Sequence, residues 1–254
     1  MTNYKILLPP SEGKLAGGEK KYITVKKQNS FNFLEKGRDY LLQKLLEFIS
    51  NADDKNLEKL FSVKTNLNQI IDLLQDFDQK LTLPAIERYS GVMFNAINYQ
   101  TLDQKQKKNA NEVILFIDGL FGLLKSGDLI PNYKLSISAK FSNIKIDNYW
   151  KNILKKTLET EFQDKVILDI LPQAHRKATD IQNNNIYLIN FFEIKNGKAK
   201  NAGHISKKLK GEFIRYILSF DEINLEILYN FSHSQGYKYS EELSSEKEVI
   251  FLKS

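Results

Sequence analysis

Acidic and basic side chains that could do chemistry lie near the ends of predicted strands. Glu12 and Lys14 follow the first apolar run of the chain, and Asp118, Asp128 and Asp169 follow or flank later ones. Carboxylates that meet at strand ends can hold a metal ion for hydrolysis of a phosphate ester. One hypothesis is therefore a metal-dependent enzyme that acts on a nucleic acid or nucleotide through Glu12, Lys14, Asp118 and Asp128.

Other chemistries lack the residues they need. The chain has no cysteine, which excludes disulfides, thiolate metal sites and cysteine nucleophiles. Its three histidines are far apart and form no metal-binding spacing, so neither a histidine metal site nor tight iron binding is expected. The loop that ends at Lys14 continues with Leu15, where a phosphate-binding loop needs Ser or Thr. We expect no cofactor.

The excess positive charge lies in one short segment. Between Lys195 and Arg215 there are six lysines and one arginine against Glu212, a net of 7 − 1 = +6, which equals the net charge of the whole chain. A helix is predicted from His204 to Leu218, and its basic side chains would project away from the apolar face. Such a helix suits a phosphate backbone, although a merely solvated lysine face gives the same pattern.

A second possible phosphate contact lies in the middle of the chain. Two short helices are predicted from Ala85 to Tyr89 and from Met93 to Ile97, joined by a turn that contains Ser90 and Gly91. Backbone amides exposed at such a turn can bind a nucleic-acid phosphate, as in a helix-hairpin-helix element, and Arg88 lies beside them. A plain connection between two helices is the alternative.

Strands and helices that must position these residues are visible as apolar patterns. Helices are predicted between Arg38 and Leu81, and a short helix from Leu120 to Leu124, while His175 is expected in a loop. Together the elements predict a mixed α/β fold, with a central mixed sheet surrounded by helices and one domain spanning residues 1–254. The predicted strands are Tyr4–Leu8, Val113–Ile117, Val166–Leu171, Ile186–Glu193 and Glu248–Leu252.

Membrane attachment is not expected from this sequence. No window approaches the roughly 18 consecutive apolar residues that a membrane-spanning helix needs. The first residues have only a short apolar run between charged ones, so they do not read as a signal peptide. We expect a cytoplasmic protein, and a monomer.

Several motifs along the chain belong together. They are Leu7–Lys14, Arg88–Val92, Asp118–Leu124, the stretch from Asp128 to Leu135, Lys207–Arg215, and Gly236–Tyr239 with Ser244. In combination these motifs resemble the peroxide-stress YaaA family. The resemblance runs from end to end, and the combination is more specific than any one motif. The chain departs from the family's usual residues at Asp118, at Lys125-Ser126 and at Ala174-His175.

The resemblance implies a cytosolic bacterial protein that is induced by peroxide, limits free intracellular iron and so protects DNA from Fenton damage. It also implies DNA binding through a basic cleft that includes a helix-hairpin-helix element, here from Ala85 to Ile97. Because no base-reading helix is evident in the sequence, we expect binding of double-stranded or structured DNA with little sequence specificity, and no enzymatic activity. On this hypothesis the phosphate-binding residues are Lys14, Arg88, Ser90, Gly91, Lys207, Lys208, Lys210 and Arg215.

Overall fold

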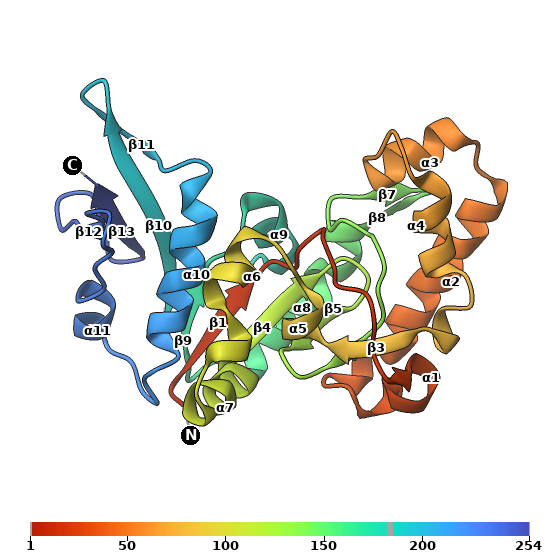
Figure 1. The fold of residues 1–254 in the computed structure, drawn as a ribbon, viewed down its shortest axis with the longest axis horizontal. Helices are drawn as coiled ribbons and strands as arrows, with labels where there is room; N and C mark the ends of the chain where they lie inside the picture. The colour runs from red at the N-terminus through yellow and green to blue at the C-terminus, as the bar shows by residue number, and fades with distance from the viewer. Residues whose placement is uncertain (1, 182–184, 254) are drawn as a thin grey trace.

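The protein has a mixed α/β fold built around a twisted central sheet. The computed structural model describes residues 2–181 and 185–253. Within these residues the largest sheet has eight strands in the order β12-β13-β10-β9-β1-β4-β5, with β11 paired to β10. Figure 1 shows this sheet through the centre and left of the molecule, with α2, α3 and α4 gathered at the right. The predicted fold class is therefore confirmed.

Buried apolar runs form the middle of the sheet, as the sequence predicts. β1 pairs in parallel with β4 on one side and with β9 on the other, and β10 continues the parallel order to β13. β5 and β12 close the two edges in antiparallel orientation. The strands are β1 Tyr4–Leu8, β4 Ile114–Asp118, β5 Gly122–Lys125, β9 Val166–Asp169, β10 Ile186–Lys195, β11 Lys198–Asn201, β12 Lys238–Tyr239 and β13 Glu248–Lys253.

The predicted helix from Leu120 to Leu124 is wrong. These residues turn back as β5, and Phe116 of β4 lies opposite Leu124. Gly122 makes the turn possible, because its φ of +71° suits glycine and an added Cβ would meet the Trp150 ring at 2.9 Å. A short apolar run packs equally well as a helix or a buried strand, so its periodicity could not distinguish the two.

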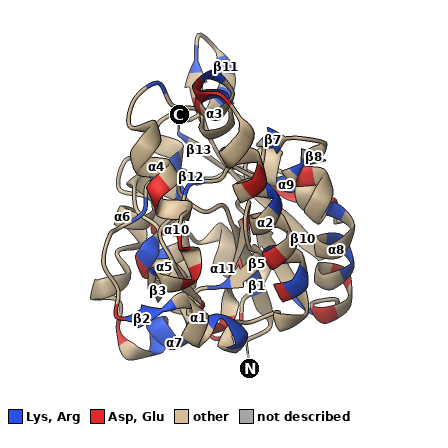
Figure 2. Ribbon diagram, turned by 90° about the vertical axis from the view of Figure 1, so that its right-hand side faces the viewer, with Lys and Arg blue, Asp and Glu red and all other residues tan. Residues whose placement is uncertain are grey.

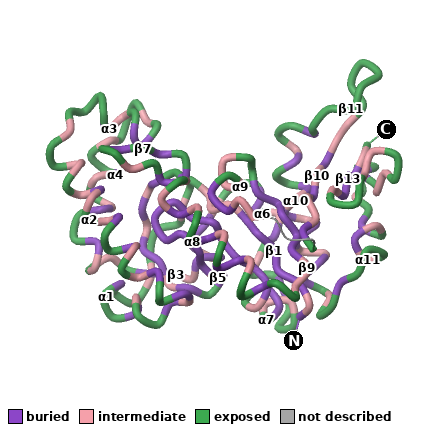
Figure 3. The backbone as a smooth tube through the Cα atoms, turned by 180° about the vertical axis from the view of Figure 1, so that it is seen from behind, coloured by how far each residue is buried: buried purple, intermediate pink, exposed green. Residues whose placement is uncertain are grey.

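Helices cover both faces of the central sheet. In Figure 1, α10 and α6 lie in front of it and α8 lies behind it; Figure 3 shows α8 from the other side. Trp150 of α8 is fully buried and donates from Nε1 to the Gly119 carbonyl at 2.9 Å, which confirms its expected core role. The helices are α1 Tyr22–Val25, α2 Glu35–Asn51, α3 Asp54–Phe61, α4 Leu67–Leu74, α5 Ala85–Arg88, α6 Val92–Ile97, α7 Gln104–Val113, α8 Ile146–Glu161, α9 Gln173–Thr179, α10 Ile205–Ile217 and α11 Leu225–Tyr229.

Short strands outside the main sheet fix the loops near its centre. β2 pairs with β3 and β3 with β6, while β7 and β8 form a separate hairpin. Figure 3 shows that buried backbone is concentrated in the central strands. Across the described residues, no helix combines the length and apolar character needed to cross a bilayer. These short strands are β2 Lys20–Lys21, β3 Leu81–Pro84, β6 Leu129–Ile130, β7 Lys140–Phe141 and β8 Ile144–Lys145.

The order of the strands marks one edge of the sheet as the place for a site. From β1 the chain returns to the sheet at β4 on one side, and later at β9 on the other side. In open α/β sheets, ligands bind beyond the carboxyl ends of the strands where the strand order reverses in this way. The loops that follow β1, β4 and β9 meet at this edge.

Candidate functional site

A small, enclosed pocket of about 110 Å³ opens where the loops after β1 and β9 come together. Lys14 and Glu12 reach it from the loop after β1, and His175 from α9, which follows β9. Lys134 lies at the rim and pairs with Glu12 at 3.1 Å. Glu12 and Lys14, which the sequence singled out as possible chemical groups after the first strand, both line this pocket.

Asp118 lies next to this pocket, at the end of β4, and is almost completely buried. Its Oδ1 accepts hydrogen bonds from the amides of Leu120 and Phe121 at 2.8 and 2.9 Å. Its Oδ2 accepts from the hydroxyls of Tyr89, at 2.9 Å, and Tyr133. Burial, together with the negative charge of Asp118, raises the pKa of both tyrosines well above the ordinary value, so both remain hydrogen-bond donors.

Lys14 extends its amine over the two tyrosines that hold Asp118. Its Nζ lies 4.3 Å from the centre of the Tyr133 ring and 5.4 Å from that of Tyr89, and donates to the Ser11 carbonyl at 3.1 Å. Burial lowers the pKa of Lys14 to about 8, although the nearby charge of Asp118 partly opposes the shift. Lys14 is partly exposed, and its expected contact with phosphate stays a prediction.

His175 is the site residue to which the sequence gave no role. It lies in the first turn of α9, not in a loop as predicted, because Pro172 starts a helix directly after β9. Its Nδ1 is buried and has no hydrogen-bond partner among residues 2–181 and 185–253. Burial lowers the pKa of His175 to about 4, against a smaller opposing effect of Asp118. The imidazole is therefore neutral at pH 7.

This histidine makes stability depend on pH in a specific interval. Between pH 6.5 and about 4 the unfolded chain binds a proton at His175 that the folded protein excludes, so stability falls as the pH falls. The loss attributable to this one residue is about 3 kcal/mol when complete, since each pKa unit corresponds to about 1.4 kcal/mol. We expect His175→Gln to reduce the acid destabilisation by that amount in urea unfolding series at pH 7, 5.5 and 4.

The matched control is His204→Gln, which removes an exposed histidine at the start of α10. An equal flattening of the pH dependence by both variants would show that the effect does not come from the buried position. Carboxylates also titrate in this interval, so only the difference between each variant and wild type is informative.

Metal-dependent chemistry at the strand ends is not supported. Both carboxylate oxygens of Asp128 accept backbone amides, from Ser30 and from Lys125 at 2.8 Å each. Asp118 is likewise fully engaged, and Glu12 pairs with Lys134 at the surface. Within the described part of the chain, no three His, Cys, Asp or Glu side chains are grouped so that they could hold a metal ion. The metal-dependent alternative stays a hypothesis that draws no support from this geometry.

Arg88 is interior, which contradicts the predicted phosphate contact. Its side chain has no exposed surface. Nε donates to the Ile130 carbonyl at 3.2 Å and Nη2 to those of Gly17 and Leu81 at 3.1 and 2.9 Å, while Nη1 donates to Leu15. The guanidinium thus ties together three backbone segments, at residues 15–17, 81 and 130, and does not reach the surface in this fold.

The hairpin around Ser90 joins two short helices, and the helix-hairpin-helix element stays a prediction. α5 is one turn of four residues and α6 has six. The Ser90 amide was predicted to be free to bind phosphate. It instead lies 2.9 Å from the Ser11 hydroxyl oxygen and 3.1 Å from the Gly13 carbonyl oxygen, and it can donate to either of them. Gly91 is exposed with a φ of +108°, and its phosphate contact stays a prediction.

The basic helix is confirmed in place, but its four cations differ in exposure. Lys207 and Lys208 are exposed, as predicted. Lys210 instead points inward and donates to the Ile170 carbonyl at 3.2 Å; burial lowers its pKa to about 8. Arg215 donates to the carbonyls that end α6, Ile97 at 2.9 Å and Asn98 at 3.1 Å. Only the first two project away from the protein.

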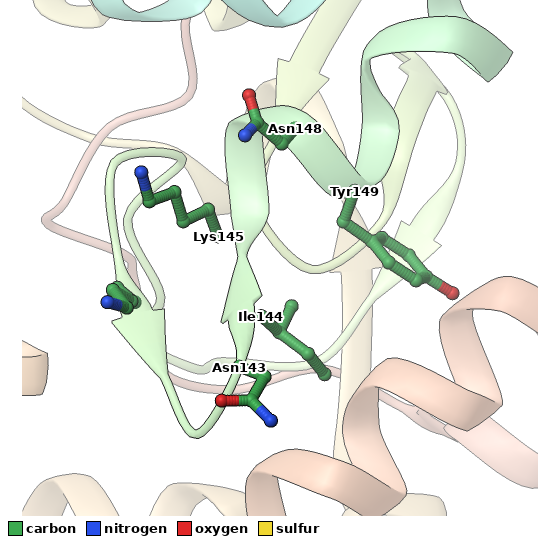
Figure 4. A pocket seen from close by; sticks show the side chains of 6 residues that line it. Asn143, Ile144, Lys145, Asn148 and Tyr149 are labelled. Carbon is green, nitrogen blue, oxygen red and sulfur yellow. The ribbon is translucent and has the colours of Figure 1, made fainter.

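A wider depression lies elsewhere, between the β7–β8 hairpin and the start of α8. Figure 4 shows Asn143, Ile144, Lys145, Asn148 and Tyr149 around it. Its volume is about 480 Å³, but it is open to solvent. Its lining carries exposed lysines and amides with no buried ionisable group, so the pocket at Lys14 is the better candidate.

Comparisons with known proteins agree with this architecture. A model of the family described as peroxide stress protein YaaA matches residues 4–243. A UPF0246 protein of Rickettsia peacockii is 30% identical over 221 residues, which cover 84% of this chain and 88% of the relative. An uncharacterised protein of Campylobacter jejuni is 34% identical over 209 residues, covering 82% of this chain and 81% of the relative.

Fold and site together define a mixed α/β protein with a buried polar centre at the carboxyl ends of its parallel strands. The chain belongs to the YaaA family of peroxide stress proteins. A role in the response to peroxide stress follows from that membership, and the predicted resemblance is confirmed.

Proposed function

We propose that this protein acts in peroxide stress by binding the phosphate backbone of duplex or structured DNA, and thereby helps to limit free iron and Fenton damage. The observation that carries the proposal is a basic surface, formed by the β10–β11 hairpin and the start of α10. We define the basic surface as Lys198, Lys200, Lys207 and Lys208, all of which are exposed.

Most of these lysines have no acidic partner. Among the ion pairs of the described residues, none involves Lys198, Lys200 or Lys207, while Lys208 lies 3.7 Å from Glu212. The hairpin residues from Ile194 to Asn201 are all exposed. Figure 2 shows basic residues on the projecting β11 hairpin. Unpaired, projecting cations gain most from a polyanion, because phosphate contacts release the counterions condensed on DNA.

The chemistry of the basic surface favours DNA binding with little sequence readout. A lysine ammonium is a point charge on a flexible stem, which neutralises phosphate but does not make the paired hydrogen bonds that read a base edge. We expect duplexes and junctions to bind in proportion to their phosphate density. A cytoplasmic location and a monomeric state are also part of the proposal.

Replacing Lys207 and Lys208 together by alanine should weaken DNA binding in a salt-dependent way. Each lost phosphate contact lowers the slope of log K against log salt by about 0.9, so the double variant should lose roughly two units. Fluorescence anisotropy of a labelled duplex and a labelled four-way junction, over a salt series, measures this slope. In peroxide-treated cells the same variant should leave free iron as high as in cells without the protein.

The matched control is Lys55→Ala/Lys59→Ala on α3, which removes the same charge from exposed positions at the far end of the molecule. If both double variants lower the slope equally, binding reflects net charge and not the basic surface. If wild type shows no salt-dependent binding to either DNA, the basic surface is simply solvated and the proposal fails.

A further inference from the structure

The pocket at Lys14 lies apart from the basic surface, so DNA binding at that surface does not explain it. It opens at the edge of the sheet where strand order reverses, between the loop after β1 and α9. Phe61, Leu135 and Ile137 form apolar walls, and Lys14 and His175 are the ionisable groups that reach inward. A small apolar pocket with a few converging polar groups is typical of a small-molecule site.

The charges around the pocket nearly cancel. Lys14, Lys134 and Arg88 carry three positive charges, and Glu12 and Asp118 carry two negative ones, so the formal sum is 3 − 2 = +1, and the Arg88 guanidinium is already engaged by backbone carbonyls. A free anion would meet two carboxylates as well as two ammonium groups and gain little. The pocket is therefore better suited to an uncharged polar ligand than to phosphate or a carboxylate.

The size of the pocket limits the ligand further. A volume of about 110 Å³ is somewhat less than a cavity that accommodates benzene, which needs about 150 Å³. A compound of three or four carbon atoms fills such a space, whereas a nucleotide does not fit.

Lys14 has the properties of a lysine that reacts as a free amine. Its Nζ is held 4.3 Å from the centre of the Tyr133 ring, and the residue is only partly exposed. With a pKa of about 8, about a tenth of the amine is neutral at pH 7, a fraction hundreds of times that of an ordinary lysine. Desolvation of this kind is how proteins activate lysine toward carbonyl groups.

His175 supplies the proton transfers that such a reaction needs. Its buried Nδ1 has no partner within the described residues, and the residue lines the same pocket as Lys14. A neutral imidazole can accept a proton at one ring nitrogen and donate at the other. An unsatisfied buried nitrogen also costs free energy.

We propose that this pocket binds a short, uncharged aldehyde or ketone, and that Lys14 forms an imine with its carbonyl carbon while His175 transfers the protons. Nζ attacks the carbonyl carbon, and its two protons pass in turn from nitrogen to the carbonyl oxygen through His175. The first transfer gives a carbinolamine, and with the second the oxygen leaves as water while the C=N bond forms. The step needs no oxidant, reductant or metal, and water reverses it.

Reductive trapping tests the proposal with glyceraldehyde as the probe. Sodium cyanoborohydride reduces an imine to a stable secondary amine, by adding hydride to carbon and a proton to nitrogen. We expect peptide mapping to find Lys14 labelled at least about tenfold faster at pH 7 than any exposed lysine, since more of its amine is neutral. Lys14→Arg should abolish this fast labelling, and Lys55→Arg, on exposed α3, should leave it unchanged.

Wild-type protein gives a second readout that does not depend on the folding of a variant. The labelling rate of Lys14 should rise with a midpoint near pH 8, whereas exposed lysines continue to gain rate up to higher pH. The charged and titratable groups that face Lys14 are Glu12, Arg88, Asp118, Lys134, His175 and the hydroxyls of Tyr89 and Tyr133. His175→Gln should slow the labelling and keep the midpoint close to that of wild type.

Three results would overturn the proposal. One is labelling of Lys14 no faster than that of surface lysines. Another is a rate that keeps rising past pH 9 in wild type. The third is crosslinking of Lys14 to duplex DNA with an abasic-site aldehyde, without any glyceraldehyde adduct, which would move the carbonyl from a small molecule to DNA. Because the basic surface is intact in Lys14→Arg, DNA binding and imine formation can fail independently.

Discussion

Arg88→Ala should cost about 3–5 kcal/mol of folding free energy, one of the two largest losses that we expect from a single substitution. The guanidinium is fully buried and donates to carbonyls of Leu15, Gly17, Leu81 and Ile130. Alanine would leave these acceptors without their donor, and would also create a cavity the size of the side chain. Urea unfolding followed by far-UV circular dichroism measures the loss.

Arg215→Ala is the matched control, because its guanidinium also donates to backbone carbonyls, those of Ile97, Asn98 and Thr101. Arg215 is half-exposed, so water can replace the lost donors and the cost should be about 1 kcal/mol. The DNA salt slope distinguishes the structural role from the predicted phosphate role. A folded Arg88→Gln protein that has lost about one unit of slope, with wild-type stability, would support the phosphate contact and refute the interior role.

The sequence predicted the strands well because their apolar runs are buried on both faces. β1 was predicted with its observed bounds, and β4, β9, β10 and β13 within a few residues. Parallel central strands carry this strong signal, since neither face contacts water. From these strands the edge that holds Lys14, Asp118 and the residues after β9 follows directly.

The polar centre itself could not be predicted in the same way. Tyr89 and Tyr133 reach Asp118 from 29 and 15 residues away, and only the tertiary fold brings them together. His175 stands near the end of a predicted strand, which was the one available signal, but nothing in its spacing from Lys14 indicates a shared pocket. Local sequence patterns predict secondary-structure elements, whereas a functional site forms only when those elements pack together.

Counting charges overestimated the phosphate-binding surface for a related reason. Net charge cannot show where a long side chain ends, and lysine and arginine can bury their stems or turn their charged groups toward backbone carbonyls. Lys210 and Arg88 both do so, while Lys207 and Lys208 do not. The hairpin lysines Lys198 and Lys200 were counted in the basic segment but were not chosen as contacts.

Lys210, Gly211 and Arg215 have structural roles in the motif from Lys207 to Arg215. Among them, Gly211 leaves the least space for a larger side chain. Gly211 lies in the middle of α10, where the helix crosses α6. An added Cβ would lie 2.3 Å from the Met93 carbonyl oxygen and 2.7 Å from the Cβ of Ala96. Contacts this short cannot be relieved by rotating a side chain, because one of them is to backbone.

Gly211→Ala should therefore destabilise the protein by about 2–4 kcal/mol, since α6 must move away from α10 and the core beneath it loosens. The expected loss opposes helix propensity, which by itself favours alanine by about 1 kcal/mol. Urea unfolding should show a lower midpoint, and the slope should stay unchanged if the denatured state is the same.

Gly37→Ala in α2 is the matched control, because it makes the same substitution inside another helix. There the added Cβ would lie 3.3 Å from the Tyr149 hydroxyl and 3.6 Å from the Trp150 ring, so small movements accommodate it. We expect the stability of Gly37→Ala to lie within about 1 kcal/mol of wild type. The higher helix propensity of alanine should offset the cost of the closer contact with Tyr149. Equal unfolding midpoints for the two variants would contradict a close crossing of α6 and α10. A destabilised Gly211→Ala that still binds DNA with the wild-type salt slope would show that the glycine serves packing, and that the neighbouring lysines serve the ligand.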